Sequence, residues 1–162
     1  MNNSFLPVRI VPKEDAVFWL DKDGCWRNRH GKFHHPKIIA RFHACIRKDE
    51  HGFYLTQDHP DFREKVYFPY EDTALFVFDV QEKDQNVILK LNTGQDVPLP
   101  PDKLSIHNDH LYMDLDGDRV KFSERALVTL SKYMQFDEER GRTWLNYQER
   151  SRIIPDYQDQ RC

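Results

Sequence analysis

Apolar positions along the chain form two stripes with helical spacing, and each stripe is preceded by short strand-like segments. The first has the i, i+1, i+4, i+7, i+8 spacing of a helix buried on one side; its members are Ile38, Ile39, Phe42, Cys45 and Ile46. Pro36 suits the first turn of that helix. Upstream, the Asp23-Gly24 pair predicts a hairpin between residues 18–20 and 25–27.

The second stripe repeats the first 88 residues later, at Ala126, Leu127, Leu130, Tyr133 and Met134. Tyr112 and Gly117 lie 86 residues after Trp26 and Gly31, and each segment closes on a strand followed by proline. Ser123 is placed to cap the second helix. The common order predicts one duplicated unit, and the alternative is a chance match between two short amphipathic helices.

The combined pattern predicts an α+β protein of two similar small units, each made of β-hairpins and one amphipathic helix, packed together. Residues 74–80 predict a central strand and residues 87–91 its hairpin partner. The segment 93–103, TGQDVPLPPDK, is rich in proline and predicts a connecting loop. We therefore expect an N-terminal unit at 1–86 and its C-terminal repeat at 87–162.

Composition supports a folded, cytoplasmic protein. The 162 residues are 39% hydrophobic and 13% aromatic, which argues against disorder. Residues 1–7 lack the basic and apolar regions of a signal peptide, and no run approaches 18 apolar residues. Cys25, Cys45 and Cys162 have no paired spacing, so we expect free thiols in a reducing compartment, with a disulfide or metal site as the alternative.

One segment of the chain has an unusual concentration of positive charge. Residues 24–48 hold seven basic residues, four histidines and no acid, in a chain whose net charge is −3. A basic hairpin leading into a helix start suits an anionic ligand. Alternatively, these residues solvate an exposed hairpin, pair with the acidic stretch that follows, or dock a protein. Extended nucleic-acid binding is disfavoured by the overall charge and the short basic stretch.

Motifs for catalysis or metal binding are absent from the sequence. His30, His34, His35 and His43 match no zinc spacing. Residues 114–118 lack the glycine placement and terminal glutamate of a calcium loop and predict a turn. No nucleophile motif or phosphate loop occurs. We therefore assign no catalytic residue, no metal and no cofactor.

A string of structural motifs resembles the bacterial DUF1285 family, whose function is unknown. The resemblance spans nearly the whole chain and rests on Asp23-Gly24, Trp26, Gly31, Ile38-Ile39, Phe42, Gly52, Tyr54-Leu55, Glu64-Lys65, Glu71-Asp72 and, in the second helix, Arg125-Ala126-Leu127. It implies a duplicated core and a C-terminal half loosely like a pleckstrin-homology fold. It also implies a ligand site between the halves, for a nucleotide-like molecule, and a role in signal transduction, with no enzymatic activity attached.

The leading hypothesis is a non-enzymatic ligand-sensing or regulatory protein that binds a small anion, nucleotide-like or otherwise, between its halves. The candidate ligand-binding residues are Arg27, Arg29, Lys32, His34, Lys37, Arg41, Glu71 and Asp72. In this hypothesis the cations hold negative charge and the two acids orient polar groups. The alternatives are an adaptor that docks a protein partner through the basic 24–48 surface, and an enzyme with a dispersed acid–base site.

Overall fold

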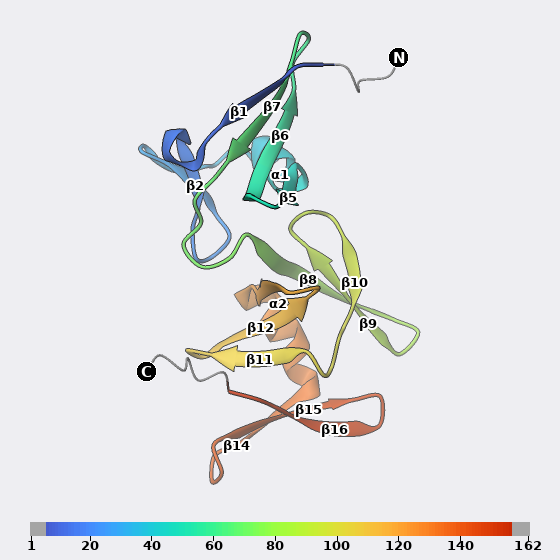
Figure 1. The fold of residues 1–162 in the computed structure, drawn as a ribbon. Coiled ribbons are helices and arrows are strands. Elements are labelled where there is room, and N and C mark those ends of the chain that lie inside the picture. The colour runs from blue at the N-terminus through green and yellow to red at the C-terminus, as the bar shows by residue number, and fades with distance from the viewer. Residues whose placement is uncertain (1–5, 157–162) are drawn as a thin grey trace. The chain divides into compact units, whose positions relative to one another are not determined.

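The computed structural model describes residues 6–156. Residues 1–5 lie outside this range, and the prediction that the chain has no signal peptide rests partly on them. Cys162, one of the three predicted free thiols, also lies outside it. Over the described range, no helix has the length and apolar character needed to cross a membrane. The chain divides between Ala74 and Leu75 into two compact units (Figure 1). Both units combine strands with one α-helix, so the class is α+β, as predicted.

The N-terminal unit is built from two antiparallel meanders joined by a helix. The first meander consists of β2 (Phe18–Leu20), β3 (Trp26–Asn28) and β4 (Gly31–Lys32). After α1 (Pro36–Ala44) the second consists of β5 (Ile46–Asp49), β6 (Gly52–Asp58) and β7 (Arg63–Tyr67). The strand β1 (Val8–Val11) pairs in parallel with β7, and a 3-10 turn at Lys13–Asp15 follows it.

The core of this unit is organised around Trp26. Its ring centroid lies 5.0–5.8 Å from those of Phe18, Phe42, His43 and Phe68. The predicted helical stripe is therefore partly wrong. Ile38 is 45% exposed, and the helix instead buries His43, which follows Phe42 on the inner side. Ile46 is buried as predicted but belongs to β5, because the helix ends at Ala44.

The C-terminal unit repeats the plan of meander, helix and meander, with extra strands. Its large sheet has the order β10-β9-β8-β13-β12-β11 and comprises β8 (Leu75–Lys83), β9 (Asn86–Leu91), β10 (Asp96–Pro98), β11 (Leu104–His107), β12 (His110–Leu115) and β13 (Asp118–Phe122). After α2 (Glu124–Leu130) and a 3-10 turn (Ser131–Tyr133), the last sheet comprises β14 (Met134–Asp137), β15 (Arg142–Tyr147) and β16 (Arg150–Ile154).

Local chemistry explains several of these elements. Ser123 caps α2 as predicted, because its hydroxyl accepts the Ala126 N–H at 3.2 Å. Asn108 and Asp109 form a two-residue turn between β11 and β12, with positive φ at both positions. Arg47 satisfies the end of α1, since its Nη1 donates to the carbonyls of Ala44 and Ile46 at 2.9 and 2.8 Å.

The division between the units falls earlier than the sequence prediction of 86/87. The strand β8 pairs with β9 on one side and with β13 on the other, so its hydrogen bonds belong to the C-terminal unit. The proline-rich segment 93–103 lies within that unit and contributes β10, which pairs with β9. It therefore connects strands of one sheet rather than two domains.

A parallel bridge closes each unit in the same manner. In the first, Leu20 of β2 lies beside Tyr70, and its N–H donates to the Pro69 carbonyl at 3.1 Å. In the second, Ile106 of β11 lies beside Asp156, with its N–H donating to the Pro155 carbonyl at 2.9 Å. Both partners of the second bridge lie 86 residues after their counterparts in the first. The prolines that follow the last strands thus occupy the same place in both units.

Candidate anion-binding groove

A groove of about 530 Å³ lies in the N-terminal unit, across β5, β6 and β7 and against the end of α1. Its lining residues are Arg41, Cys45, Arg47, Tyr54, Thr56, Gln57, Asp58, Arg63 and Lys65. Four of these side chains are cationic and one is a carboxylate. Every one of them comes from the first unit, and Cys45 is a free thiol.

Strand register brings the lining residues to one face of the sheet. Tyr54 pairs with Arg47 on one side and with Tyr67 on the other, and the next outward position pairs Thr56 with Lys65. The intervening positions on the three strands are the buried residues Ile46, Leu55 and Val66. Because successive side chains on a strand alternate between faces, one face packs in the core and the other carries the polar groove.

Two cations in the groove are held by carboxylates. Arg63 Nε donates to Asp58 Oδ1 at 2.7 Å, and this bond lowers the pKa of Asp58. Lys65 Nζ lies 3.3 Å from Asp49 Oδ2 and 4.7 Å from the centroid of the Tyr54 ring. Both ion pairs leave that part of the groove close to neutral.

Asp49 also receives a short hydrogen bond from β7 of the same sheet. The Tyr67 hydroxyl donates to Asp49 Oδ2 at 2.6 Å, which lowers the pKa of Asp49 and raises the pKa of Tyr67 to about 12. The carboxylate therefore stays ionised, and the phenol stays protonated, throughout the neutral range. This fixed network holds Lys65 in place against the Tyr54 ring.

The remaining positive charge lies at the α1 end of the groove. Arg41 is exposed on the last turn of α1, and within the described part of the chain it has no carboxylate partner. Arg47 donates only to main-chain carbonyls, so its charge is likewise not neutralised by a described acid. These two guanidinium groups are the ones available to an anion.

Among the predicted ligand-binding residues, only Arg41 lines this groove. Arg27 lies on β3, and its Nε donates to Asp21 Oδ2 at 2.6 Å. Burial alone would raise the pKa of Asp21, but the Arg27 bond and the N–H donors of Cys25 and Asp23 lower it. Arg27 therefore helps to build the β2–β3 loop.

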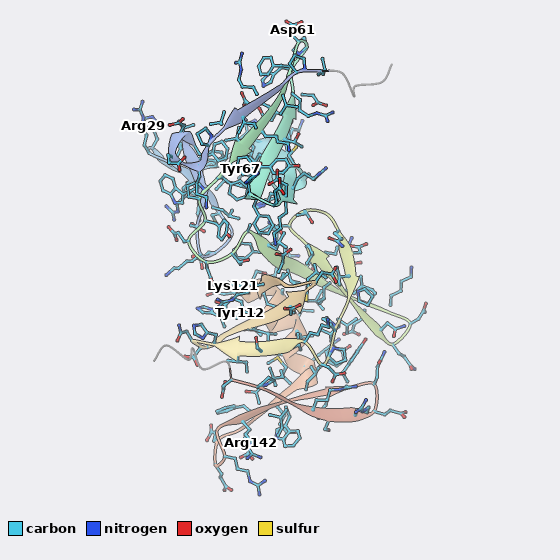
Figure 2. All side chains as sticks on the ribbon, viewed as in Figure 1. Arg29, Asp61, Tyr67, Tyr112, Lys121 and Arg142 are labelled. Atoms are coloured by element: carbon cyan, nitrogen blue, oxygen red, sulfur yellow. The ribbon has the colours of Figure 1, made fainter. Side chains whose placement is uncertain are left out.

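The other predicted cations lie elsewhere on the N-terminal unit and are exposed. Arg29 occupies the β3–β4 turn, away from the strand that carries Tyr67 (Figure 2). Lys32 ends β4, His34 follows it, and Lys37 begins α1. The basic segment of the sequence is thus divided between an exposed hairpin and the groove at the far end of α1.

The predicted acidic pair lies beside the β2–β3 loop. Glu71 Oε2 accepts the Lys22 N–H at 2.9 Å, and the Glu71 N–H donates to the Leu20 carbonyl. The hydrogen bond that Arg27 donates to Asp21 is the largest cause of the raised pKa of Arg27, and the charge of Glu71 adds to it. Asp72 follows and is half-buried. Glu71 thus braces the loop that Asp21 organises.

The histidines are dispersed. His43 is buried beside Trp26, and burial lowers its pKa to about 4, whereas His34 and His35 are exposed. Across the residues that the structure describes, no group of three His, Cys, Asp or Glu side chains is placed to hold a metal ion.

Sequence reasoning missed Arg47 as a groove residue, and also Tyr54, Arg63 and Lys65. A signal was present, because residues 63–67 alternate between Arg, Lys and Tyr on one side and Glu and Val on the other. That alternation predicts a polar strand face. The pairing of that face with β5 and β6 depends on register, which the sequence pattern does not specify.

The corresponding face of the C-terminal unit also holds a groove, of about 590 Å³, with the opposite charge. Gln135 pairs with Trp144 in this unit, and the similar pair in the N-terminal unit is Arg47 with Tyr54. Asn146 pairs with Ser151, and the similar pair is Thr56 with Lys65. The lining consists of Gln135, Phe136, Asp137, Glu138, Glu139, Trp144, Asn146 and Ser151. It contains acids and no lysine or arginine.

Comparison with known proteins identifies the fold. No family model matches the sequence, and no curated protein matches it significantly. A DUF1285 family protein from Silicibacter pomeroyi DSS-3 superposes with a TM-score of 0.60 over 92% of this chain and 84% of its own, at 13% identity. The fold is that of DUF1285 proteins.

A second DUF1285 protein agrees. The structure from Shewanella baltica OS155 has a TM-score of 0.52 and 15% identity, and the match covers 74% of this chain and 94% of that one. The predicted resemblance to DUF1285 is therefore confirmed at the level of fold. Neither neighbour is described by an activity or a ligand. A function for this protein therefore has to be inferred from its own groove.

Proposed function

We propose that the protein is a non-enzymatic ligand-sensing or regulatory protein that binds a small anionic ligand in the groove of its N-terminal unit. The observation that carries this proposal is the set of four cations and one carboxylate around about 530 Å³. That volume is within the range of small-molecule sites. A concave surface with net positive charge, supplied here by Arg41 and Arg47, concentrates anionic ligands.

The arginines at the α1 end are suited to a phosphate or carboxylate group. A guanidinium group presents donors in a planar fork that can grip such a group through two parallel hydrogen bonds. Arg47 is already fixed by its bonds to Ala44 and Ile46, so ordering it on ligand binding costs little side-chain entropy.

We also propose that the two units arose by duplication of one module. The shared order of elements, the equivalent parallel bridges and the equivalent strand pairs support this origin. Under this proposal Arg47 and Lys65 correspond to Gln135 and Ser151, so the cationic groove is a specialisation of the first copy. A common scaffold that differs in charge at one face favours a binding role for that face.

A thermal-shift titration tests the anion proposal. Inorganic phosphate and adenosine monophosphate, added at constant ionic strength, should raise the melting temperature in proportion to the logarithm of their concentration. Arg41→Ala should reduce this rise, because it removes an exposed cation whose side chain forms no hydrogen bond or ion pair with the described residues. Gln135→Ala is the matched control and should retain the full rise. Absence of a rise with every anion, or an undiminished rise in Arg41→Ala, would sink the proposal.

A second candidate function is that of an adaptor that docks an acidic protein. The favouring observation is the exposed hairpin and helix start, where Arg29, Lys32 and Lys37 form no ion pair with the described residues. Such an interaction weakens as salt increases, because the charges are exposed. Reversal of charge at Arg29 and Lys32 would abolish partner binding in this case, whereas Arg41→Ala would leave it intact.

A further inference from the structure

The cations of the groove are not equally available to a ligand. Arg63 donates to both oxygens of Asp58, at 2.7 and 3.5 Å, and Lys65 pairs with Asp49. Arg41 and Arg47 lack such partners among the residues described. Net positive charge is therefore confined to the α1 end, and the rest of the groove is polar but close to neutral.

The neutral part of the groove is long. Strand pairing places Tyr54 beside Arg47 at the charged end, while Asp58 pairs with Arg63 at the other. Tyr54 and Asp58 are four positions apart on β6, which corresponds to about 13 Å along a strand. A lone phosphate at the arginines would leave this length unfilled.

The side chains along that length offer hydrogen bonds. Thr56 is half-buried, and its side chain makes no hydrogen bond to another described residue. Asp58 keeps acceptor capacity beyond its bonds to Arg63, because an ionised carboxylate accepts at about four lone-pair positions. Hydroxyl groups, which both donate and accept, are the complement of a threonine and a carboxylate on the same face of a strand.

We infer that the ligand is a phosphate monoester of a polyhydroxylated body, such as a sugar phosphate. Its phosphate lies between Arg41 and Arg47, and its hydroxyls bind along Thr56 and Asp58. This inference rests on the proposed anion-binding function and narrows it to ligands with one anionic head. It excludes polyanions as the preferred class, since the other two cations of the groove, Lys65 and Arg63, are already neutralised by Asp49 and Asp58.

Calorimetric titration of the full chain at fixed ionic strength tests it with four probes. Inorganic phosphate should bind weakly, glucose 6-phosphate about tenfold more tightly through two or more additional hydrogen bonds, and glucose without its phosphate should give no measurable heat. Pyrophosphate should bind no more tightly than glucose 6-phosphate. Equal binding of phosphate and glucose 6-phosphate, or a preference for pyrophosphate, overturns the inference and leaves the proposed function standing. Absence of binding by every phosphate overturns both.

Variants separate the head from the body of the ligand. Thr56→Val preserves the shape of the side chain. It should weaken the affinity for glucose 6-phosphate about threefold to tenfold and leave the affinity for inorganic phosphate unchanged. Arg41→Ala should weaken the affinities for inorganic phosphate and for glucose 6-phosphate by the same factor. Thr56→Ala provides a second test should Thr56→Val fold poorly, and Asn146→Ala is the matched control in the C-terminal unit. Equal losses for phosphate and glucose 6-phosphate in both body variants would contradict the assigned orientation.

Discussion

His43 shows how one residue couples the core to pH. It is 5% exposed and its ring centroid lies 5.6 Å from that of Trp26. Burial lowers its pKa to about 4 from an ordinary value of 6.5. The unfolded chain therefore binds a proton between these values while the native protein does not, and this difference destabilises the native state as pH falls.

This titration gives a prediction for stability. The contribution of neutral His43 is fully present above pH 6.5 and is lost as pH falls toward about 4, a decrease of about 3 kcal/mol in the free energy of unfolding. Urea denaturation at a series of pH values should give a shallower dependence for His43→Phe than for the wild type. The exposed residue His34 offers the control, and His34→Gln should follow the wild-type curve. Parallel curves for His43→Phe and the wild type would show that His43 does not titrate in this way.

At the scale of the element, a cap decides where α2 begins. The Ser123 hydroxyl accepts the Ala126 N–H, one of the donors that a helix start leaves unpaired. Ala126 and Leu130 are completely buried, so the first turn must be formed for the helix to pack.

Removal of this cap should destabilise the protein. We expect Ser123→Ala to lower the free energy of unfolding by about 1 kcal/mol, measured by urea denaturation at neutral pH. The hydroxyl of Thr129 bonds back to the Arg125 carbonyl on the exposed side of the same helix, so Thr129→Ala is a near-neutral control. A stability for Ser123→Ala equal to that of the control would contradict the capping role.

The sequence predicted an element correctly where a single local feature, such as a capping residue or a proline, determines where that element begins. Pro36 begins α1 and Ser123 caps α2 as predicted, and all but the first residue of the predicted strand 74–80 lies within β8, which pairs with β9, the strand that contains 87–91. The stripe of α1 was predicted less well, because a histidine occupies an inner position that hydropathy assigns to the surface. His43 is buried there because its ring packs against Trp26, a contact between segments that no local pattern encodes.

The candidate site was harder to predict because its residues converge only through pairing. A run of basic residues marked 24–48, but Arg27 is held by Asp21 and the exposed hairpin does not reach the groove. Arg63 and Lys65 join Arg41 only because β5, β6 and β7 form one meander. Likewise, the predicted boundary after residue 86 missed the pairing of β8 with β13.

At the scale of the whole molecule, the two units share a plan and differ in charge. The overall net charge of −3 conceals a groove rich in arginine and lysine on one unit and an acidic groove on the equivalent strands of the other. This difference in charge distinguishes the two grooves, and we propose that the groove of the N-terminal unit is the one that binds the anion.

The most direct test is a 15N-resolved NMR titration of the full chain with glucose 6-phosphate at constant ionic strength. We predict amide shift changes concentrated at the end of α1 and along β5, β6 and β7, and their loss in Arg41→Ala. The amides of β14, β15 and β16, which carry the equivalent acidic groove, should stay unperturbed. Changes centred on the hairpin of Arg29 and Lys32, or on the C-terminal unit, would contradict the assignment of the anion site to the groove.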